Sequence, residues 1–302
     1  MNAGRVAHVP MGSRALARAA DRVYARFLAL AAIPAVLPWM LFALHGGPAM
    51  LRGAHLWGMV WLGVGILPVL AASWTLVRKA AATATLLRWC QDRQLPLPDK
   101  VRACMVRLGL HEGQCIMYAD ARPSVFTAGW LAPRVYLSAG CVQLLEEDEL
   151  ALVLAHEQHH VRSRDPLRAA FAGAMAEAWR LLPVLPQAFR QYRQLQEIAA
   201  DAWALERALP GPGAAGGDAD SLQRRLDLAA VVIKLWSAAR RAPVIDGVSA
   251  AFTDMPDRLT WLLQGENPLC APARFDGWAQ SAVLVATFVS AYLIICPISP
   301  AI

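Results

Sequence analysis

Long uncharged apolar runs are the strongest constraint in this sequence. No Asp, Glu, Lys or Arg occurs in residues 27–51, 56–77 or 277–302, and each run is long enough to cross a bilayer, which takes about 20 apolar residues. Charged residues make up only 17% of the chain and hydrophobic residues 57%, whereas soluble domains average about 25% charged residues. The pattern predicts three membrane spans and argues against a disordered chain or a purely soluble globule.

Basic residues near these runs predict which way the chain crosses the membrane. Five arginines and one aspartate precede the first run, and further basic residues follow the second, whereas the loop at 46–55 has only Arg52. Because Lys and Arg accumulate on the cytoplasmic side, we expect a cytoplasmic N-terminus, an external loop and an external C-terminus. A cleaved signal peptide is the alternative for the first run, but a long basic region precedes that run and a second run soon follows.

The predicted organisation has three parts. Residues 1–77 form a basic arm and two transmembrane helices, 78–275 a cytoplasmic body, and 277–302 a C-terminal transmembrane helix. We therefore expect a multi-pass protein of a bacterial-type inner (cell) membrane, whose topology accounts for the net charge of +6 without nucleic acid. A fourth hydrophobic stretch, 169–185, contains two charged residues, which cost at least a few kcal/mol at mid-bilayer. We expect it to form a buried or interfacial helix, with a further span as the alternative.

The body mixes helical and strand-like patterns. Short runs at 115–118, 124–128 and 134–137 predict a small antiparallel sheet, and the Gly-rich segment 211–220 predicts a flexible linker. The six cysteines include no CxxC pair and are expected to be reduced, buried thiols. The fold class is thus a mainly α membrane protein with a small antiparallel β-sheet. Helical periodicity is found at 81–94, 99–110, 146–161, 187–209, 221–241 and 256–263.

The helix predicted at 146–161 carries an HExxH motif, His156-Glu157-Gln158-His159-His160. Histidines four residues apart project from one helical face and can hold one Zn²⁺ through their ring nitrogens. Glu157 lies beside them and can act as general base on a water molecule that zinc makes more acidic. Three histidines by chance are the alternative, but the motif follows an apolar turn late in a helix, as a buried metal site requires.

A catalytic zinc site usually has three protein ligands, and no histidine follows the motif. The third ligand should therefore be a carboxylate, and Glu197 and Asp201 lie four residues apart on one helical face. We expect Glu197 to bind the metal and Asp201 to accept a hydrogen bond from the non-ligating nitrogen of one histidine. A solvated acidic pair beside Arg193 is the alternative. His159 is expected at the surface or behind the ligands.

These motifs resemble the membrane-embedded gluzincins typified by the BlaR-type and MecR-type antirepressor peptidases. Residues 126–168 are similar to that family's proline-containing hairpin, small helix and acid-opened HExxH helix. The segment 197–201 matches its ExxxD element, and Asp257-Arg258-Leu259 resembles its late Arg-Leu helix. The resemblance covers residues 78–265, with specific zinc motifs and a diffuse remainder.

The resemblance implies a gluzincin-type metalloprotease domain between transmembrane helices. It implies that His156, His160 and Glu197 bind one zinc ion per chain, that Glu157 is the base, and that Asp201 supports a ligand. The β-lactam-sensing domain of the antirepressor relatives is expected to be absent, because the sequence ends soon after the last span. Heat-shock and CAAX-processing zinc proteases are a second match, but they carry clear spans between the two zinc motifs.

The leading hypothesis is an integral-membrane zinc endopeptidase that hydrolyses peptide bonds of a cytoplasmic protein in signalling. The expected partners are the lipid bilayer and a protein or peptide substrate, for which a DNA-binding transcriptional repressor is the family-level expectation; no direct nucleic-acid contact is expected. The alternatives are a protease of membrane protein quality control and a non-catalytic signalling scaffold, although a scaffold has no need of Glu157. The sequence leaves the oligomeric state, the signal and the substrate open.

Substrate binding requires an extended peptide to lie across the metal. An exposed strand edge supplies partners for the backbone of such a peptide. The runs 124–128 and 134–137 are nearest in sequence to the HExxH helix, and each follows a proline. We expect 124–128 to be the edge that pairs with substrate, with a purely structural hairpin as the alternative.

Overall fold

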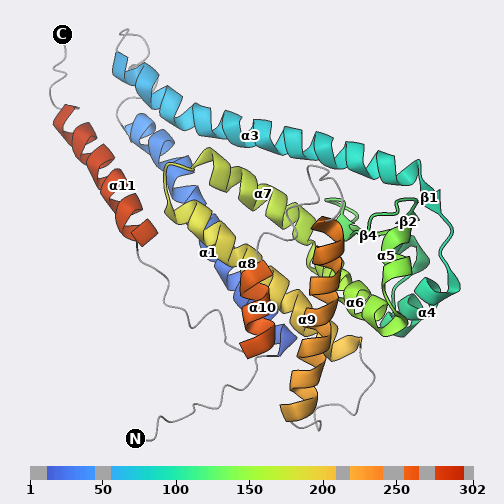
Figure 1. Cartoon of the computed structure of the whole chain (residues 1–302). Coiled ribbons are helices and arrows are strands. Elements are labelled where there is room, and N and C mark those ends of the chain that lie inside the picture. The colour runs from blue at the N-terminus through green and yellow to red at the C-terminus, as the bar shows by residue number, and fades with distance from the viewer. Residues whose placement is uncertain (1–11, 45–55, 209–217, 241–254, 265–275, 296–302) are drawn as a thin grey trace, which may run out of the picture. The chain divides into compact units, whose positions relative to one another are not determined.

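A computed structural model describes residues 12–44, 56–208, 218–240, 255–264 and 276–295. The predicted loop at 46–55 and most of the predicted linker at 211–220 lie outside the described residues. Backbone contacts divide the chain into two units, whose elements are labelled in Figure 1. The first comprises residues 1–21, 78–170 and 193–271, and the second 22–77, 171–192 and 272–302.

The described residues of the second unit are helical except for a turn at 179–183. The boundary between the units falls inside four helices, so only α11 belongs wholly to the second unit. The predicted span at 56–77 and the predicted helix at 81–94 form one continuous helix, because no helix breaker lies between them. The helices concerned are α1 (Ser13–Leu44), α3 (Leu56–Gln91), α7 (Asp165–Ala178), α8 (Val184–Arg207) and α11 (Asp276–Ile295).

Within the described part of the chain, one helical stretch, Ser13–Met40, is long and apolar enough to cross a bilayer. The runs at 56–77 and 277–295 are helical as well, but they do not meet the same test over the described residues. Three spans and the orientation given above therefore stay predictions.

The hydrophobic stretch 169–185 does not form one helix. Helix α7 ends at Ala178, a turn follows at 179–183, and α8 begins at Val184. Side chains from both helices, including Ala172 and Leu185, are buried in a cluster with Phe27 of α1. The expectation of burial is met at Ala172, Ala176, Val184 and Leu185, but the stretch is parts of two helices joined by a turn and not the one helix that was expected.

The first unit contains a four-stranded sheet of order β1-β2-β4-β3. Pairs β1·β2 and β3·β4 are antiparallel, but β2 and β4 are parallel, with Ile116 opposite Tyr136. The prediction of an antiparallel sheet is therefore wrong, and the sheet is mixed. The strands are β1 (Gln94–Leu95), β2 (Cys115–Tyr118), β3 (Val125–Ala128) and β4 (Arg134–Ser138).

The hairpin of β3 and β4 explains why β2 and β4 are neighbours and run parallel. The hairpin folds back so that β4 lies between β2 and β3, and Gly129 begins its turn with a φ of 104°. A side chain there would meet the carbonyl oxygen of Ala132 at 2.7 Å, so the turn needs glycine. All of β2 and almost all of β4 are buried, as expected for strands that are covered on both faces.

Strand β3 lies at an edge of this sheet. Its neighbour is β4, and no second strand pairs with it among the described residues. The Ser138 N–H donates to the Ser124 carbonyl, and residues of an antiparallel pair alternate between hydrogen-bonded and non-hydrogen-bonded positions. The N–H and C=O groups of Val125 and Thr127 therefore point away from β4, to the open edge.

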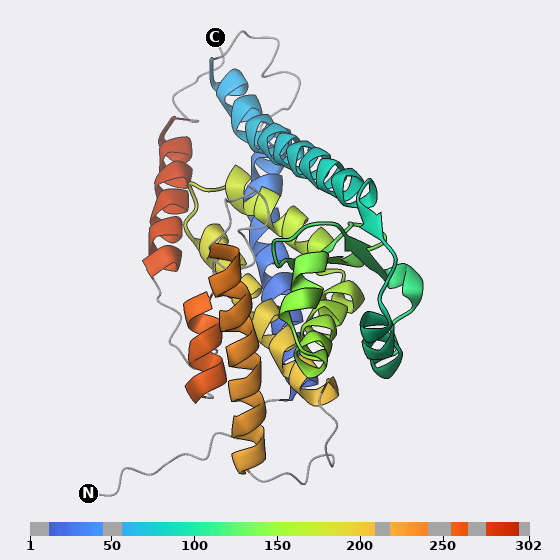
Figure 2. The same ribbon diagram turned by 45° about the vertical axis from the view of Figure 1, so that its right-hand side comes forward.

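Helices α5 and α6 pack against β4, and α6 also packs against β3 (Figure 2). The main core of this unit surrounds α6, whose Leu150 and Leu154 are fully buried. Four cysteines in the described residues are free and buried, as expected; Cys270 and Cys296 lie outside those residues. The remaining helices of the unit are α4 (Asp99–Leu108), η1 (Glu112–Gln114), α5 (Ala139–Leu144), α6 (Glu147–Ser163), α9 (Asp218–Arg240) and α10 (Met255–Gln264).

Candidate metal centre

Helix α6 carries the HExxH motif on a buried stretch. Its start is fixed by a capping box between Glu146 and Glu149, and its acidic first turn complements the helix dipole. Every residue from Leu150 to His160 is buried. The four-residue spacing therefore places the rings of His156 and His160 side by side in the interior of the unit.

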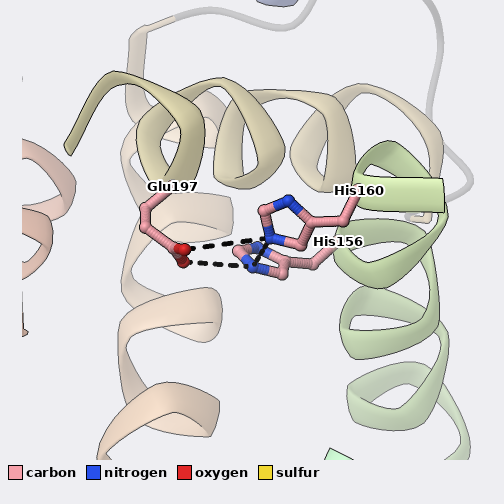
Figure 3. A group of neighbouring side chains, drawn as sticks. All are labelled: His156, His160 and Glu197. Atoms are coloured by element: carbon pink, nitrogen blue, oxygen red, sulfur yellow. Dashed lines mark hydrogen bonds and ion pairs between the residues drawn. The ribbon is translucent and has the colours of Figure 1, made fainter. Parts of the chain in front are cut away.

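Glu197 of α8 faces these two histidines (Figure 3). The Nε2 atoms of His156 and His160 lie 3.1 Å apart. One oxygen of Glu197 is 3.5 Å from Nε2 of His156, and the other is 4.0 Å from Nε2 of His160. Ligand atoms of the three residues all lie within 4.8 Å of one another. The structure thus brings together the three residues that were predicted as metal ligands.

The second nitrogen of each histidine faces a buried carboxylate. Nδ1 of His156 lies 2.8 Å from Oδ1 of Asp201, and Nδ1 of His160 lies 2.7 Å from Oδ2 of Asp165. The His156 contact is short but is not aligned as a hydrogen bond, so it is an electrostatic contact. Carboxylates in these positions hold each ring with Nδ1 protonated and Nε2 free to bind a metal.

Arg164 explains how Asp165 reaches His160. Helix α6 ends at Ser163, and Arg164 adopts the left-handed conformation with φ 53° and ψ 39°. This turn starts α7 at Asp165, which brings its carboxylate back to the last turn of α6. A non-glycine residue in that conformation costs roughly 1–2 kcal/mol. The contact of Asp165 with His160 offsets part of this cost.

Arg258 of α10 links the two carboxylates of α8. Its guanidinium donates to both oxygens of Asp201, at 3.0 and 2.6 Å, and lies 3.3 Å from Oε2 of Glu197. Arg258 is only 7% exposed and Asp201 is fully buried. A planar guanidinium can pair with two acceptors at fixed angles, which an ammonium group cannot do. Arg193 adds a further contact of 3.2 Å to Oε1 of Glu197.

These contacts keep both α8 carboxylates ionised. Burial alone would raise the pKa of Glu197, but His156 and the charges of His160, Arg258 and Arg193 outweigh it and hold this pKa well below its usual value. Burial opposes ionisation of Asp201 as well, but Arg258 and His156 lower its pKa. Two fixed negative charges therefore border the histidine pair.

Carboxylates outnumber guanidinium groups around the centre. Four carboxylates, of Glu157, Asp165, Glu197 and Asp201, lie in or next to the cavity, and two guanidinium groups, of Arg193 and Arg258, face them. This arrangement suits the binding of a cation.

The same carboxylates act on His156. Burial lowers the pKa of His156, but Asp201 and Glu197 overcome that effect and raise this pKa to about 9. The surroundings of the ring therefore favour positive charge. Two imidazoles and a carboxylate are a donor set that suits Zn²⁺, so the residues present fit the metal that the sequence predicts.

The cavity beside the centre has a polar floor and an apolar wall. It has a volume of about 180 Å³ and is bordered by His156, Glu157 and His160. The edge strand β3 lines it through Val125, Phe126 and Thr127. Apolar side chains of α6 and α9 complete the wall: Val153, Leu228, Val232 and Leu235.

His159 does not lie at the surface as one expectation held. It is only 7% exposed, and its ring packs 5.7 Å from Trp203. Burial lowers the pKa of His159 to about 4, so the ring is neutral near pH 7. His159 therefore packs between helices α6 and α8 and is not among the three converging groups.

From the sequence alone, no role in the metal centre was given to two residues that contact it. Asp165 and Arg258 both fell in segments noted for a family resemblance, yet neither received a role. An acidic residue directly after the HExxH helix was the available signal for Asp165. For Arg258 the signal was weaker, since it lies 57 residues after Asp201 and one arginine among many carries little information.

Comparison with known proteins supports the relationship suggested by the motifs. A family model described as "BlaR1 peptidase M56" matches residues 53–210, just over half of the chain. A protein named "Protease HtpX homolog", from Pelotomaculum thermopropionicum, is 32% identical over 156 residues. That alignment covers 49% of this chain and 52% of the relative, so the chain spans about half the length of that protein. Arg258 lies beyond the residues that the family model matches.

We expect about one Zn²⁺ per purified chain. Changing His156, His160 or Glu197 to Ala should abolish binding, because each removes one converging donor. Glu157→Gln should retain the metal, because this residue is not expected to be a ligand. Elemental analysis after dialysis measures both effects. Equal metal loss in Glu157→Gln would contradict the assignment of roles.

Arg258→Met should destabilise the metal-free protein strongly. The substitution leaves buried Asp201 without a guanidinium partner and Glu197 with Arg193 alone, and breaking a buried ion pair in this way costs about 3–5 kcal/mol. Arg102→Met is the matched control, because Arg102 is half exposed and pairs only at the surface, where less than about 1 kcal/mol is expected. Denaturant unfolding in detergent compares the two. Equal effects would show that Arg258 does not stabilise the centre.

Proposed function

Because this chain belongs to the BlaR1 peptidase M56 family, we propose that it is an integral-membrane zinc endopeptidase. The observation that carries the proposal is the buried group of His156, His160 and Glu197, with Glu157 in the same cavity. The proposed substrate is a cytoplasmic protein cleaved in signalling, with a DNA-binding transcriptional repressor as the first candidate.

The proposed reaction divides the work among the residues of the cavity. Zinc, when bound, supplies a Lewis acid that polarises the scissile carbonyl and makes water more acidic. Glu157 takes a proton from the attacking water and passes it to the amine nitrogen as the C–N bond breaks. Asp201 and Asp165 keep the two imidazoles in one tautomer and orientation, which maintains the geometry through the cycle.

The open edge of β3 supports the proposed mode of substrate binding. Val125 and Thr127 direct their backbone groups to that edge, and both residues line the cavity. An extended peptide can add to such an edge as a further strand, which holds its backbone beside the centre. The apolar wall from α9 favours a substrate with an apolar side chain next to the cleaved bond.

We propose that the body at 78–275 faces the cytoplasm, between two N-terminal spans and one C-terminal span. The support is the distribution of basic residues around the apolar runs. Reporter fusions after Lys100 and at Ile302 should lie on opposite sides of the membrane. Finding both reporters on one side would refute this topology.

A second candidate function is protein quality control in the membrane. The relative named as a protease HtpX homolog is the observation that favours it. The two functions differ in substrate range, since a signalling protease cleaves one or few proteins and a quality-control protease many. A neighbouring gene for a small DNA-binding repressor would favour signalling.

Glu157→Gln should retain zinc and lose proteolysis. The substitution removes the base, and general-base catalysis contributes about 10²- to 10⁴-fold to such reactions. Expressed in cells, the variant should also trap its substrates, which mass spectrometry can identify after cross-linking. Undiminished cleavage of labelled casein by the zinc-loaded variant would exclude Glu157 as the base. Absence of cleavage of both casein and the trapped proteins by the zinc-loaded wild type would favour the scaffold alternative.

Val125→Pro should weaken substrate binding without loss of zinc. Proline removes the N–H that points to the open edge, and one hydrogen bond contributes about 0.5–1.5 kcal/mol, or roughly 2- to 10-fold in KM. Val125→Ala is the control, because it shortens the side chain and keeps the N–H. If the two variants have the same KM for labelled casein, β3 is a structural hairpin only.

A further inference from the structure

Thr127 connects the edge strand to the proposed base. Its Oγ1 lies 2.6 Å from Oε2 of Glu157 and 3.1 Å from the Glu157 backbone oxygen. A hydroxyl group has one proton to donate, and the shorter distance and the charge of the carboxylate favour Oε2 as acceptor. Among the described residues, no other side chain hydrogen-bonds the Glu157 carboxylate.

Thr127 also borders the open edge of the sheet through its backbone. Side chains alternate along a strand, so Thr127 reaches α6 while Phe126 stacks on Tyr136 on the other face. The backbone of Thr127 points to the open edge of the sheet, as the ladder of β3 and β4 requires. One residue therefore contacts the base with its side chain and borders the substrate path with its backbone.

We propose that Thr127 is a positioning residue for Glu157, and that it couples strand pairing by the substrate to the orientation of the base. This inference rests on the proposed protease function. The Thr127 hydroxyl fixes Oε2 and leaves Oε1 to take the proton of the attacking water. That proton passes through Glu157 to the leaving amine, and the Thr127 proton stays on Oγ1 throughout.

A purely structural role is the alternative to a positioning role. The same hydroxyl lies near the Glu157 carbonyl, so it also ties β3 to α6. A structural role predicts lower stability and lower zinc content when the hydroxyl is lost, with kcat falling only as far as zinc does. A positioning role predicts a fall in kcat in fully zinc-loaded protein, with KM almost unchanged.

The test compares Thr127→Val, which has the same shape without a hydroxyl, with Thr127→Ser, which keeps the hydroxyl. With labelled casein as probe, we expect Thr127→Val to lose about 10-fold in kcat, part of the general-base contribution. Thr127→Ser should stay within about threefold of the wild type. Zinc content and the thermal unfolding midpoint are measured on each variant. Thr127→Ala replaces Thr127→Val if the latter does not fold.

A second readout does not depend on activity. Infrared spectra of metal-free protein carrying ¹³C-labelled glutamate identify the Glu157 carboxylate band by its absence in Glu157→Gln. This band should shift in Thr127→Val and stay in place in Thr127→Ser, because only the former loses the donor. An unshifted band, or a zinc-loaded Thr127→Val protein with wild-type kcat, would overturn the inference.

The outcomes separate the inference from the function on which it rests. If the wild type cleaves casein, Glu157→Gln does not, and Thr127→Val equals the wild type, only the inference fails. If the wild type and Glu157→Gln cleave casein and the trapped substrates equally or not at all, the proposed function fails and the inference fails with it.

Discussion

The charge balance around the buried carboxylates of α8 is the constraint on which the centre depends. Glu197 and Asp201 are almost completely excluded from water, where an isolated ionised carboxylate is strongly disfavoured. Arg258 and the histidines of α6 make ionisation favourable, and the ionised groups in turn orient those histidines. The geometry of the metal ligands therefore depends on the same contacts that keep the two carboxylates ionised. The carboxylates of the centre outnumber its guanidinium groups, which suits the binding of a divalent metal by the two histidines and Glu197.

Helix α6 is the element around which the other parts are arranged. One of its faces packs in the main core, its late turns carry the two histidines, and β3 crosses beside Glu157. The mixed order of the sheet matters here, because insertion of β4 next to β2 moves β3 to the open edge. An antiparallel sheet built in chain order would place β3 in its interior, with no edge available next to the cavity.

Local patterns allowed much of this arrangement to be predicted. The i,i+4 rule places His156 beside His160 and Glu197 beside Asp201, since it depends only on helix geometry. The predicted boundaries of α4 and α6 were close because a proline precedes the first of these helices and acidic residues mark the first turn of each, whereas the predicted helix 81–94 is the end of a helix that begins at Leu56 and ends at Gln91. The parallel pairing of β2 with β4 was not predictable, because strand order depends on packing between distant segments. The contact of Asp165 with His160 depends on the left-handed backbone of Arg164, which an arginine in the sequence does not indicate. The contact of Arg258 with Asp201 joins residues 57 positions apart, which no local pattern predicts.

The distance along the chain between Asp201 and Arg258 has a consequence for biosynthesis. A ribosome delivers the HExxH and ExxxD elements well before it delivers α10, so the growing chain has two carboxylates that cannot be buried at low free energy. The centre can close only after α10 has been made. A nascent or truncated chain that ends before Arg258 is therefore kept from forming the complete centre, which separates synthesis of the protein in time from assembly of its reactive group.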